Sequence, residues 1–303
     1  MTTAAEWTRA ELWRRKLVYP GHTLPTALAP ALVACGLAAH DGTFAAVPAL
    51  LAFLAGWLVQ LGGVLTDNYE NLLREPEDRE HPELVRALRR GTLTLRQLKS
   101  AIAACYLLAL LIGAVLVSMA GPVVLAIGLL SIAASWAYSA GPAPIGRLGL
   151  ADPLFFLFFG AVSVAGIYYV QAAPALPARA LALGVPIGAL TTNILIVDDI
   201  RDREFDATKG KRTVAVRFGK EWSRAEFLAL LALAYAAPLW LRPAFGFGDW
   251  ILLPWLTAPL AAALARTVMR LERHEDLIPV TPRAGRLLLA YAVLLAVGAA
   301  APG

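Results

Sequence analysis

Long apolar runs recur from one end of this 303-residue chain to the other, and each is about long enough to cross a lipid bilayer. A backbone inside lipid finds no water to bond, so a spanning segment makes its hydrogen bonds internally, as a helix does. The chain is therefore predicted to be an all-α polytopic membrane protein. Nine transmembrane helices are expected, near 23–40, 43–66, 98–119, 122–139, 153–172, 179–198, 225–241, 250–269 and 285–301.

Lysine and arginine predict how these segments are oriented. Only 16% of the residues are charged, against about a quarter in soluble domains. The start of the chain is polar and lacks the pattern of a secretion signal, so we expect the N-terminus in the cytoplasm. Of the 27 basic residues, 25 then fall in inner segments, which is the positive-inside pattern. The inner segments are 1–22, 67–99, 140–151, 199–224 and 266–286.

The basic net charge of +5 follows from this topology, because the loops face an anionic inner leaflet. It therefore indicates a membrane-lipid partner and no nucleic acid. The inner segments after the second and sixth spans are long and rich in charge, while the outer loops are short. We expect the chemistry on the cytoplasmic side, in a central cavity capped by helices of these loops.

The inner segment after the sixth span begins with a dense acidic run, "DDIRDREFD". Asp198, Asp202 and Asp206 are spaced by four, so on a helix they lie on one stripe about 80° wide, with Asp199 beside them. Like charges repel at this spacing, and near a membrane each ionised acid costs up to about 3 kcal/mol. A hard divalent cation such as Mg²⁺ offsets the cost, because it takes oxygen ligands and shares them with phosphate.

The same skeleton occurs 131 residues earlier, in "TDNYENLLREPED". Asp67, Asn68, Asn71 and Glu75 stand at offsets 0, 1, 4 and 8, which are also the offsets of the four aspartates of the later run. Either run alone could be a solvated helix with salt bridges. Two copies of one spacing, each closing an expected span, favour a pair of half-sites with oxygen ligands.

Basic residues follow both acidic runs. A metal can bridge carboxylate to phosphate while lysine and arginine neutralise the remaining phosphate oxygens. The arrangement therefore predicts a site for a magnesium diphosphate. The basic candidates are Arg89 and Arg90 after the first run, and Lys209, Lys211 and Arg212 after the second.

These motifs together resemble those of the UbiA-type intramembrane aromatic prenyltransferases. Members carry a first motif NDxxDxxxD and a second motif DxxxD or DDxxD, after spans two and six of nine. Here the matching segments are "DNYENLLRE" and "DDIRDREFD", of which the first has fewer acids than the family pattern and the second has more. The "GKRT" tail and "YSAGPAPIGRLGLADPLFFLFFG", residues 138–160, look closest to the branch that acts on 1,4-dihydroxy-2-naphthoate in menaquinone synthesis.

The resemblance covers most of the chain, and it implies one domain, 1–303, with motif halves of about 1–150 and 151–303. It implies transfer of a polyprenyl group from an allylic diphosphate to an aromatic acid, at the cytoplasmic side of a bacterial inner membrane. Tyr69 and Tyr138 are candidates to face the allylic cation with their rings, and Arg147 to bind the diphosphate. The implied ligands of two Mg²⁺ ions are Asp67, Asn68, Asn71 and Glu75 in one half, and Asp198, Asp199, Asp202 and Asp206 in the other.

Other functions stay open at this point. Within the same class, the acceptor could be 4-hydroxybenzoate or another aromatic compound, because scattered residues decide that choice. A secondary transporter would also show internal symmetry, but its polar residues sit near mid-membrane and its repeats are often inverted. Here the charges lie at the cytoplasmic ends and both copies share one orientation. A phosphatidyl-type transferase also uses acidic motifs, but its usual DG…AR…G…D pattern is absent.

Overall fold

The computed structural model describes residues 8–13, 17, 23–74 and 82–302, and this part of the chain is helical with no strand. Eight of its helical segments are long and apolar enough to cross a membrane, which confirms the all-α polytopic prediction. They are Thr23–His40, Ala46–Arg74, Leu95–Ala120, Ala151–Ala172, Ala178–Thr208, Lys220–Phe245, Asp249–Arg270 and His274–Ala300. The remaining expected span is Val123–Ser139, an apolar helix of 17 residues that is shorter than the other eight.

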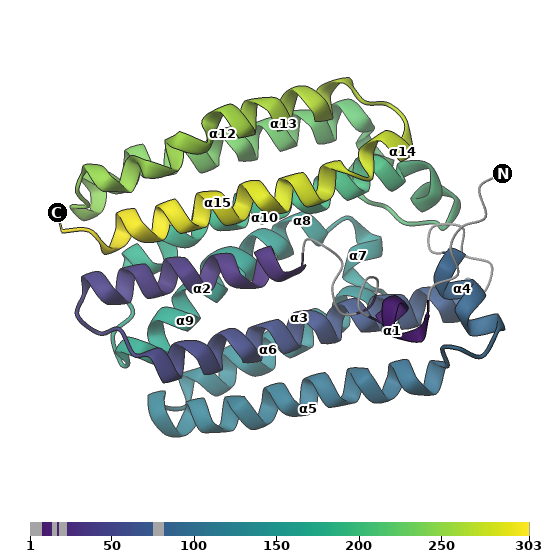
Figure 1. Cartoon of the computed structure of the whole chain (residues 1–303), viewed down its shortest axis with the longest axis horizontal. Coiled ribbons are helices and arrows are strands. Elements are labelled where there is room, and N and C mark those ends of the chain that lie inside the picture. Colours follow the sequence, from purple (N-terminus) through teal and green to yellow (C-terminus); the bar gives the residue numbers. More distant parts are fainter. Residues whose placement is uncertain (1–7, 14–16, 18–22, 75–81, 303) are drawn as a thin grey trace.

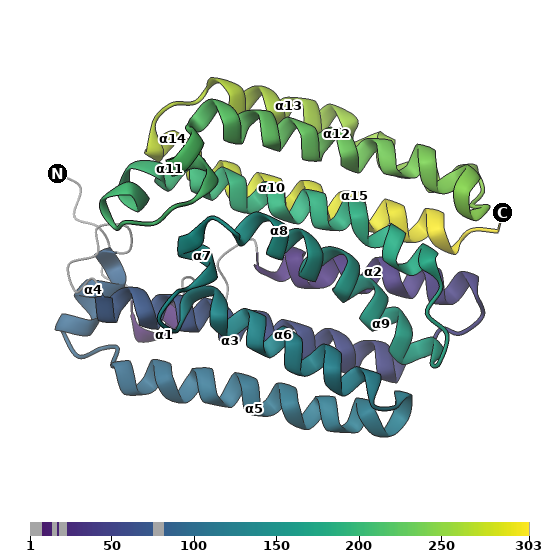
Figure 2. The same cartoon turned by 180° about the vertical axis from the view of Figure 1, so that it is seen from behind.

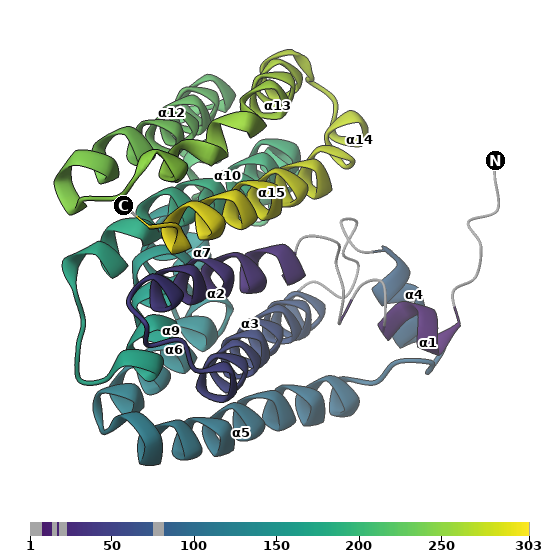
Figure 3. The same cartoon turned by 60° about the vertical axis from the view of Figure 1, so that its left-hand side comes forward.

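The long helices lie side by side in one bundle (Figure 1). Helix α5, Leu95–Ala120, forms one edge, while α12, Lys220–Phe245, and α13, Ala258–Arg270, form the opposite edge (Figures 1 and 2). Figure 3 shows the bundle from its side, with the same order of elements. The helices between the two edges are α2 (Thr23–His40), α3 (Ala46–Arg74), α6 (Val123–Ser139), α9 (Ser163–Ala172), α10 (Ala178–Thr208) and α15 (Val280–Ala300).

Short helices gather at the end of the bundle that lies away from the C-terminus (Figures 1 and 2). They belong to the connections that the sequence predicts to face the cytoplasm, as expected for helices that cap a site. These elements are α1 (Arg9–Leu12), α4 (Pro82–Arg89), α7 (Ile145–Leu148), α11 (Val214–Phe218) and α14 (His274–Leu277).

The described residues of the first acidic motif, Asp67, Asn68 and Asn71, and all four aspartates of the second lie on the last turns of long helices, and not in loops after the spans. Helix α3 has 29 residues and α10 has 31, whereas the expected spans ended at 66 and 198. At 1.5 Å per residue each helix is about 45 Å long, and the hydrocarbon core is about 30 Å thick. The final turns therefore extend beyond the apolar layer, so the charged residues can continue the helix at little cost.

Glycines let α10 approach the segment that precedes α9. This segment begins as α8, Ala151–Phe155, and continues as a π-helical stretch, η2, over Phe156–Val162. A Cβ on Gly188 would lie 2.4 Å from the Phe156 carbonyl oxygen, and a Cβ on Gly160 would lie 2.6 Å from that of Gly184. Small residues at helix contacts in membranes allow this close backbone packing. The contact fixes α8 beside the acidic end of α10.

A buried arginine joins α12 to α13. The Arg224 guanidinium donates to the carbonyls of Val268 and Leu271, 3.2 and 2.9 Å away, at the C-terminal end of α13. It also pairs with the Glu221 and Glu272 carboxylates. The last carbonyls of a helix have no intrahelical partner, so a basic side chain there satisfies groups that would otherwise be unbonded.

Candidate functional site

A small pocket opens where α3 and α6 end, beside the chain that follows α10. It encloses about 30 Å³, room for about two water molecules. Five of the residues that the sequence singles out line it, although they come from four separate elements of the chain. The lining residues are Asp67, Glu70, Asn71, Arg74, Tyr138, Ser139, Pro144, Gly146, Arg147 and Lys211.

Asp67 is the acid of the first motif that this pocket contains. Its Oδ1 accepts a hydrogen bond of 2.7 Å from the Ser139 hydroxyl, and its Oδ2 accepts one of 3.1 Å from the Asn71 amide. The first bond crosses from α3 to α6, and the second runs along α3 between residues four apart. Both bonds hold the carboxylate at the pocket wall. The Asn71 side chain donates through its nitrogen, so its amide oxygen is the atom that suits a metal.

The other residues of the first motif have different positions. The Asn68 amide is buried and donates to the Val64 carbonyl of its own helix, 2.8 Å away. Tyr69 packs against a hydrophobic cluster that includes Leu65 and Leu72, so the structure does not bring it to the pocket lining. Glu75 lies outside the described residues.

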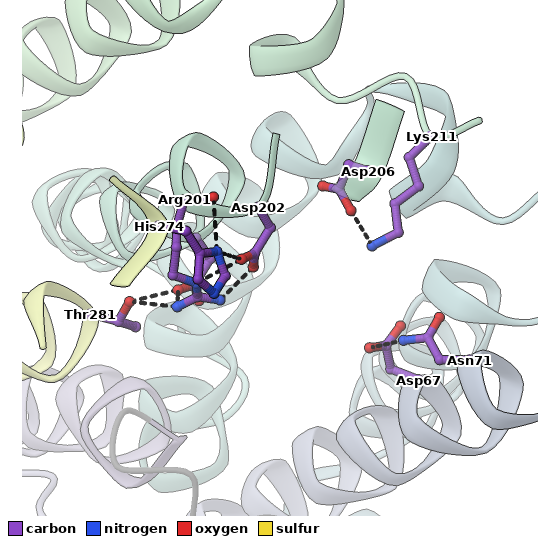
Figure 4. Close-up of polar contacts among 9 residues, drawn as sticks. Asp67, Asn71, Arg201, Asp202, Asp206, Lys211, His274 and Thr281 are labelled. Atoms are coloured by element: carbon purple, nitrogen blue, oxygen red, sulfur yellow. Dashed lines mark hydrogen bonds and ion pairs between the residues drawn. The ribbon is translucent and has the colours of Figure 1, made fainter. Parts of the chain in front are cut away.

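The four aspartates of the second motif divide into two groups, and Figure 4 shows one labelled member of each, Asp202 beside Arg201 and Asp206 beside Lys211. Asp198 and Asp202 both pair with the guanidinium of Arg201, on the side of α10 that faces α14 and α15. Asp206 lies in the other group and pairs with Lys211, whose Nζ is 2.7 Å from its Oδ1. Asp199 is half-buried and lies seven residues before Asp206, so both point from the same face of α10, and we place it with the second group.

Lys211 connects the second motif to the pocket, because it both lines the pocket and pairs with Asp206. Arg147 lies beside it, held by the chain after α10. The Arg212 backbone N–H donates to the Arg147 carbonyl at 2.9 Å, and Arg147 Nη1 donates to the Lys209 carbonyl at 3.4 Å. The connection after α6, which contains α7, is thus hydrogen-bonded to the loop after α10. This contact brings two predicted basic residues, Arg147 and Lys211, to one pocket.

A glycine makes this meeting of loops possible. Gly149 has a φ of +76°, in the left-handed region, and a Cβ there would lie only 2.3 Å from the Arg212 carbonyl oxygen. Any other residue would be strained by its backbone and would also push the two loops apart.

The remaining basic candidates lie outside the pocket lining. Arg212 contributes its backbone to the contact of the loops, and its side chain is exposed. Lys209 is half-buried and likewise contributes its carbonyl. Arg89 and Arg90 are exposed at the end of α4.

Tyr138, a candidate of the sequence, lines the pocket. Its half-buried ring is 5.5 Å from the ring of Phe155, centroid to centroid, at a tilted angle. Asp67 and Asp199 are both in its electrostatic surroundings, so the ring lies near residues of both acidic motifs. An electron-rich face at this point is suited to stabilise a developing cation.

Sequence reasoning missed several residues of the site. Glu70 and Arg74 line the pocket and pair with each other at 3.0 Å. Their spacing of three and seven residues from Asp67 places them on the same helical face, so the periodicity of α3 could have found them. Asp152 gave no such signal. It is a buried acid of α8, near Asp199, and its Oδ1 has no hydrogen-bond partner among the residues that the structure describes.

The oxygen donors of both motifs are of the kind that a divalent cation takes. Within the described ranges, no three His, Cys, Asp or Glu side chains are already grouped as a metal centre. Mg²⁺ does not require such a cage, because in proteins it usually takes one or two carboxylates together with water and substrate phosphates. Helix α3 provides one such carboxylate, Asp67, and α10 provides two, Asp199 and Asp206. The donor set therefore fits the cation.

Comparisons with known proteins agree with these features. A model described as the UbiA prenyltransferase family matches residues 27–279. A 1,4-dihydroxy-2-naphthoate octaprenyltransferase of Mycobacterium tuberculosis is 33% identical over 275 residues, which are 90% of this chain and 92% of the relative. A protein of the same name from Escherichia coli is 32% identical over 276 residues, 88% of each chain.

Solved structures share the fold. The apo structure of a UbiA homologue from Aeropyrum pernix aligns with a TM-score of 0.69 and 18% identity, over 88% of this chain and 96% of that chain. A UbiA homologue from Archaeoglobus fulgidus bound to DMAPP and Mg²⁺ aligns with a TM-score of 0.61 and 15% identity, over 93% and 98%. At these identities the likeness establishes the arrangement of helices alone.

The fold and the matched sequence together define an integral membrane protein that is an enzyme of prenyl transfer. The chain belongs to the UbiA prenyltransferase family. This result confirms the family resemblance of the sequence and decides for a prenyltransferase over the transporter and phosphatidyl-transferase alternatives.

Proposed function

We propose that this chain transfers a polyprenyl group from an allylic diphosphate to 1,4-dihydroxy-2-naphthoate, as a step of menaquinone synthesis. The observation that carries the proposal is the pocket, which places an acid of the first motif, Asp67, beside the basic residues Arg147 and Lys211. The acceptor rests on the relatives, because those that match over about nine tenths of the chain are named for that naphthoate. The second candidate acceptor is 4-hydroxybenzoate, which differs in its ring but also presents a carboxylate.

The basic residues account for the diphosphate. Arg147 and Lys211 face one pocket from two different loops, so they can bind phosphate oxygens from two sides. A diphosphate is larger than the present pocket, so the side chains at its rim must move apart when it binds. We propose that Arg89, Arg90, Lys209 and Arg212 contribute positive charge around this opening.

Mg²⁺ is the cation that we propose for this site. When bound, it would neutralise the charge that develops on the departing diphosphate. The proposed ligands are Asp67, Asn68, Asn71 and Glu75 on one side, and Asp198, Asp199, Asp202 and Asp206 on the other.

The chain's own residues also act on the organic part of the reaction. As the bond from the allylic carbon to the diphosphate oxygen breaks, positive charge spreads over the allyl group. The Tyr138 ring can stabilise that charge by about 0.5–2 kcal/mol, and we propose the same role for Tyr69. The electron-rich ring of the acceptor then attacks the allylic carbon. Attack at the carboxylated carbon of the naphthoate would release CO₂, with the bonding electrons returning to the ring.

The placement in the membrane completes the proposal. We propose that Val123–Ser139 crosses as a ninth span, since 17 residues are at the lower limit for a transmembrane helix. From the positive-inside pattern we propose that the N-terminus and the pocket lie on the cytoplasmic side, and we propose a bacterial inner membrane as the location. We also propose that 1–303 is a single domain in which each half carries one acidic motif.

A reconstituted assay tests the function. Purified protein in lipid nanodiscs is incubated with Mg²⁺, a labelled polyprenyl diphosphate, and either 1,4-dihydroxy-2-naphthoate or 4-hydroxybenzoate. We expect a lipophilic product with the naphthoate, and its mass shows whether CO₂ has been lost. The same assay is run on Asp67→Asn, which removes the charge of the first-motif acid in the pocket. Asp276→Asn, which makes the same change at an exposed aspartate on α14, is its control. Product with 4-hydroxybenzoate alone would exchange the acceptor, and no product with any aromatic acid would refute the proposal.

A further inference from the structure

Arg201 occupies two of the carboxylates that the sequence assigns to a cation. Its Nε donates to Asp202 Oδ1 at 2.8 Å and its Nη2 donates to Asp202 Oδ2, so this pair is bidentate. Its Nη1 forms a second ion pair, with Asp198 Oδ1. Both oxygens of Asp202 and one oxygen of Asp198 are therefore already bonded to a positive group of the chain (Figure 4).

Residues of the C-terminal helices hold this arrangement in place. The Thr281 hydroxyl donates to Asp198 Oδ1 at 2.6 Å and accepts from Arg201 Nη1 at 3.2 Å. His274 Nδ1 lies 3.3 Å from Asp202 Oδ1 and 3.2 Å from the Arg201 carbonyl oxygen. Because both neighbours accept hydrogen bonds, this nitrogen carries the proton. Asp198 and Asp202 are thus turned toward α14 and α15.

The pocket lies on the other side of the motif. Asp206 pairs with Lys211, which lines the pocket, whereas Asp198, Arg201 and Asp202 are absent from the lining. Asp202 is also buried, with 4% of its surface exposed. A carboxylate in this position can bind an ion in the pocket only after its bonds to Arg201 are released.

We propose that Arg201 is a positioning residue that acts as an internal counter-cation, holding Asp198 and Asp202 until a divalent cation displaces it. The inference rests on the proposed function for the presence of that cation. Arg201 and the cation compete for the same oxygens, and the three side chains carry a net charge of −1. Arg201 therefore lowers the affinity for the cation, and in the absence of the cation it neutralises one of the two negative charges of the half-buried Asp198 and the buried Asp202.

The test measures cation binding without substrates. Mn²⁺ is titrated into purified protein in detergent and followed by electron paramagnetic resonance. Arg201→Gln removes the positive charge, so we expect Mn²⁺ to bind about tenfold more tightly than to the wild type. Arg201→Lys keeps a charge but loses the bidentate geometry, so its affinity should stay within about threefold of the wild type.

Arg203→Gln is the matched control. It removes the same charge from the same helix, two residues away, where the Arg203 guanidinium donates to the Ala215 carbonyl and not to a motif acid. We expect it to leave Mn²⁺ affinity unchanged. Equal tightening in Arg203→Gln would reduce the effect to net charge and overturn the inference, as would unchanged or weaker binding in Arg201→Gln.

Thr281→Val provides the test if Arg201→Gln fails to fold. It keeps the shape of the side chain and removes one bond from Asp198 and one from Arg201, so we expect about twofold tighter Mn²⁺ binding. Unchanged affinity there would refute the inference. Prenyl transfer by the wild type is measured separately. If the wild type forms product but Arg201→Gln binds Mn²⁺ no more tightly, the proposed function stands and only the role of Arg201 is overturned.

Discussion

Lys211 Nζ lies 2.7 Å from Asp206 Oδ1, and this ion pair joins the end of α10 to the pocket that contains the first acidic motif. The two residues are five apart in sequence, on either side of the turn that closes the helix. Because Lys211 also lines the pocket, it can move its charge from the Asp206 carboxylate to an incoming phosphate. Several expected outcomes depend on this and on neighbouring contacts.

Lys211→Met should weaken the binding of the prenyl diphosphate. Loss of a hydrogen bond to a charged group costs about 1.5–3 kcal/mol, so we expect kcat/KM to fall by about 10- to 100-fold, chiefly through KM for the diphosphate. Initial rates at varied polyprenyl diphosphate measure this effect. Lys99→Met, which changes an exposed lysine near the start of α5, is the control. An unaltered KM in Lys211→Met would remove this residue from the diphosphate site.

Asp67 and its partner should differ in the size of their effects. Asp67→Asn keeps the shape but removes the charge, and we expect turnover to fall by about 10²-fold or more. Ser139→Ala removes only the hydrogen bond to the Asp67 carboxylate, which contributes about 1.5 kcal/mol, so a loss of about tenfold is expected. The measurement is turnover across a Mg²⁺ titration, with Ser118→Ala as the control, since that serine bonds only within α5. If Ser139→Ala matched Asp67→Asn, the serine would have a direct role.

Gly149→Ala should separate the two loops that form the site. Gly91 provides a matched control, because it has a similar φ of +72° but no atom within 4 Å of a Cβ. Both substitutions cost about 1–2 kcal/mol for the left-handed backbone. Only Gly149→Ala adds the clash with Arg212, so kcat/KM should fall by about tenfold or more in that variant alone. Activity and thermal unfolding are measured for both, and equal activities would contradict the role of the loop contact.

Arg224→Met should lower stability without a specific effect on the site. The substitution leaves the carbonyls of Val268 and Leu271 unbonded, and we expect the free energy of unfolding to fall by about 1–3 kcal/mol. Thermal unfolding in detergent measures the change. Arg266→Met, whose guanidinium bonds only the Ala262 carbonyl on the exposed face of α13, should be near neutral. A wild-type midpoint in Arg224→Met would contradict the structural role.

The ion pair between Arg224 and Glu272 predicts that stability depends on pH in the acid range. The hydrogen bond from Arg224 lowers the pKa of Glu272 below its usual value of 4.5. A lowered pKa means that the folded state binds the proton less well than the unfolded state. The contribution of Glu272 is therefore present above about pH 4.5 and is lost as the pH falls through its folded pKa. The free energy of unfolding should fall with acid in both wild type and Glu272→Gln, and the two curves should differ in shape only in that pH range. The difference should be small, because the Glu272 side chain is exposed.

The sequence predicted the all-α fold class, and five of its candidate residues line the pocket. Hydrophobic segment length sets membrane crossing, and the positions of Asp67, Asn71, Tyr138, Arg147 and Lys211 followed from repeated spacing, basic neighbours and family motifs. These signals are local, or they repeat along the chain, so they can be read without knowing which helices touch. The lengths of α3 and α10 were underestimated, because charged residues end an apolar run but do not end a helix.

The tertiary structure decided which of the predicted residues share a site. Helical geometry places Asp198, Asp202 and Asp206 on one stripe, but their partners come from other elements. Thr281 and His274 fix the first two toward the C-terminal helices, while Lys211 holds the third toward the pocket. Asp152 joins this region only because glycines bring its segment against α10. The spacing of residues along one helix determines the direction in which their side chains point around the helix axis. The partner that each side chain contacts depends on packing between segments far apart in the sequence.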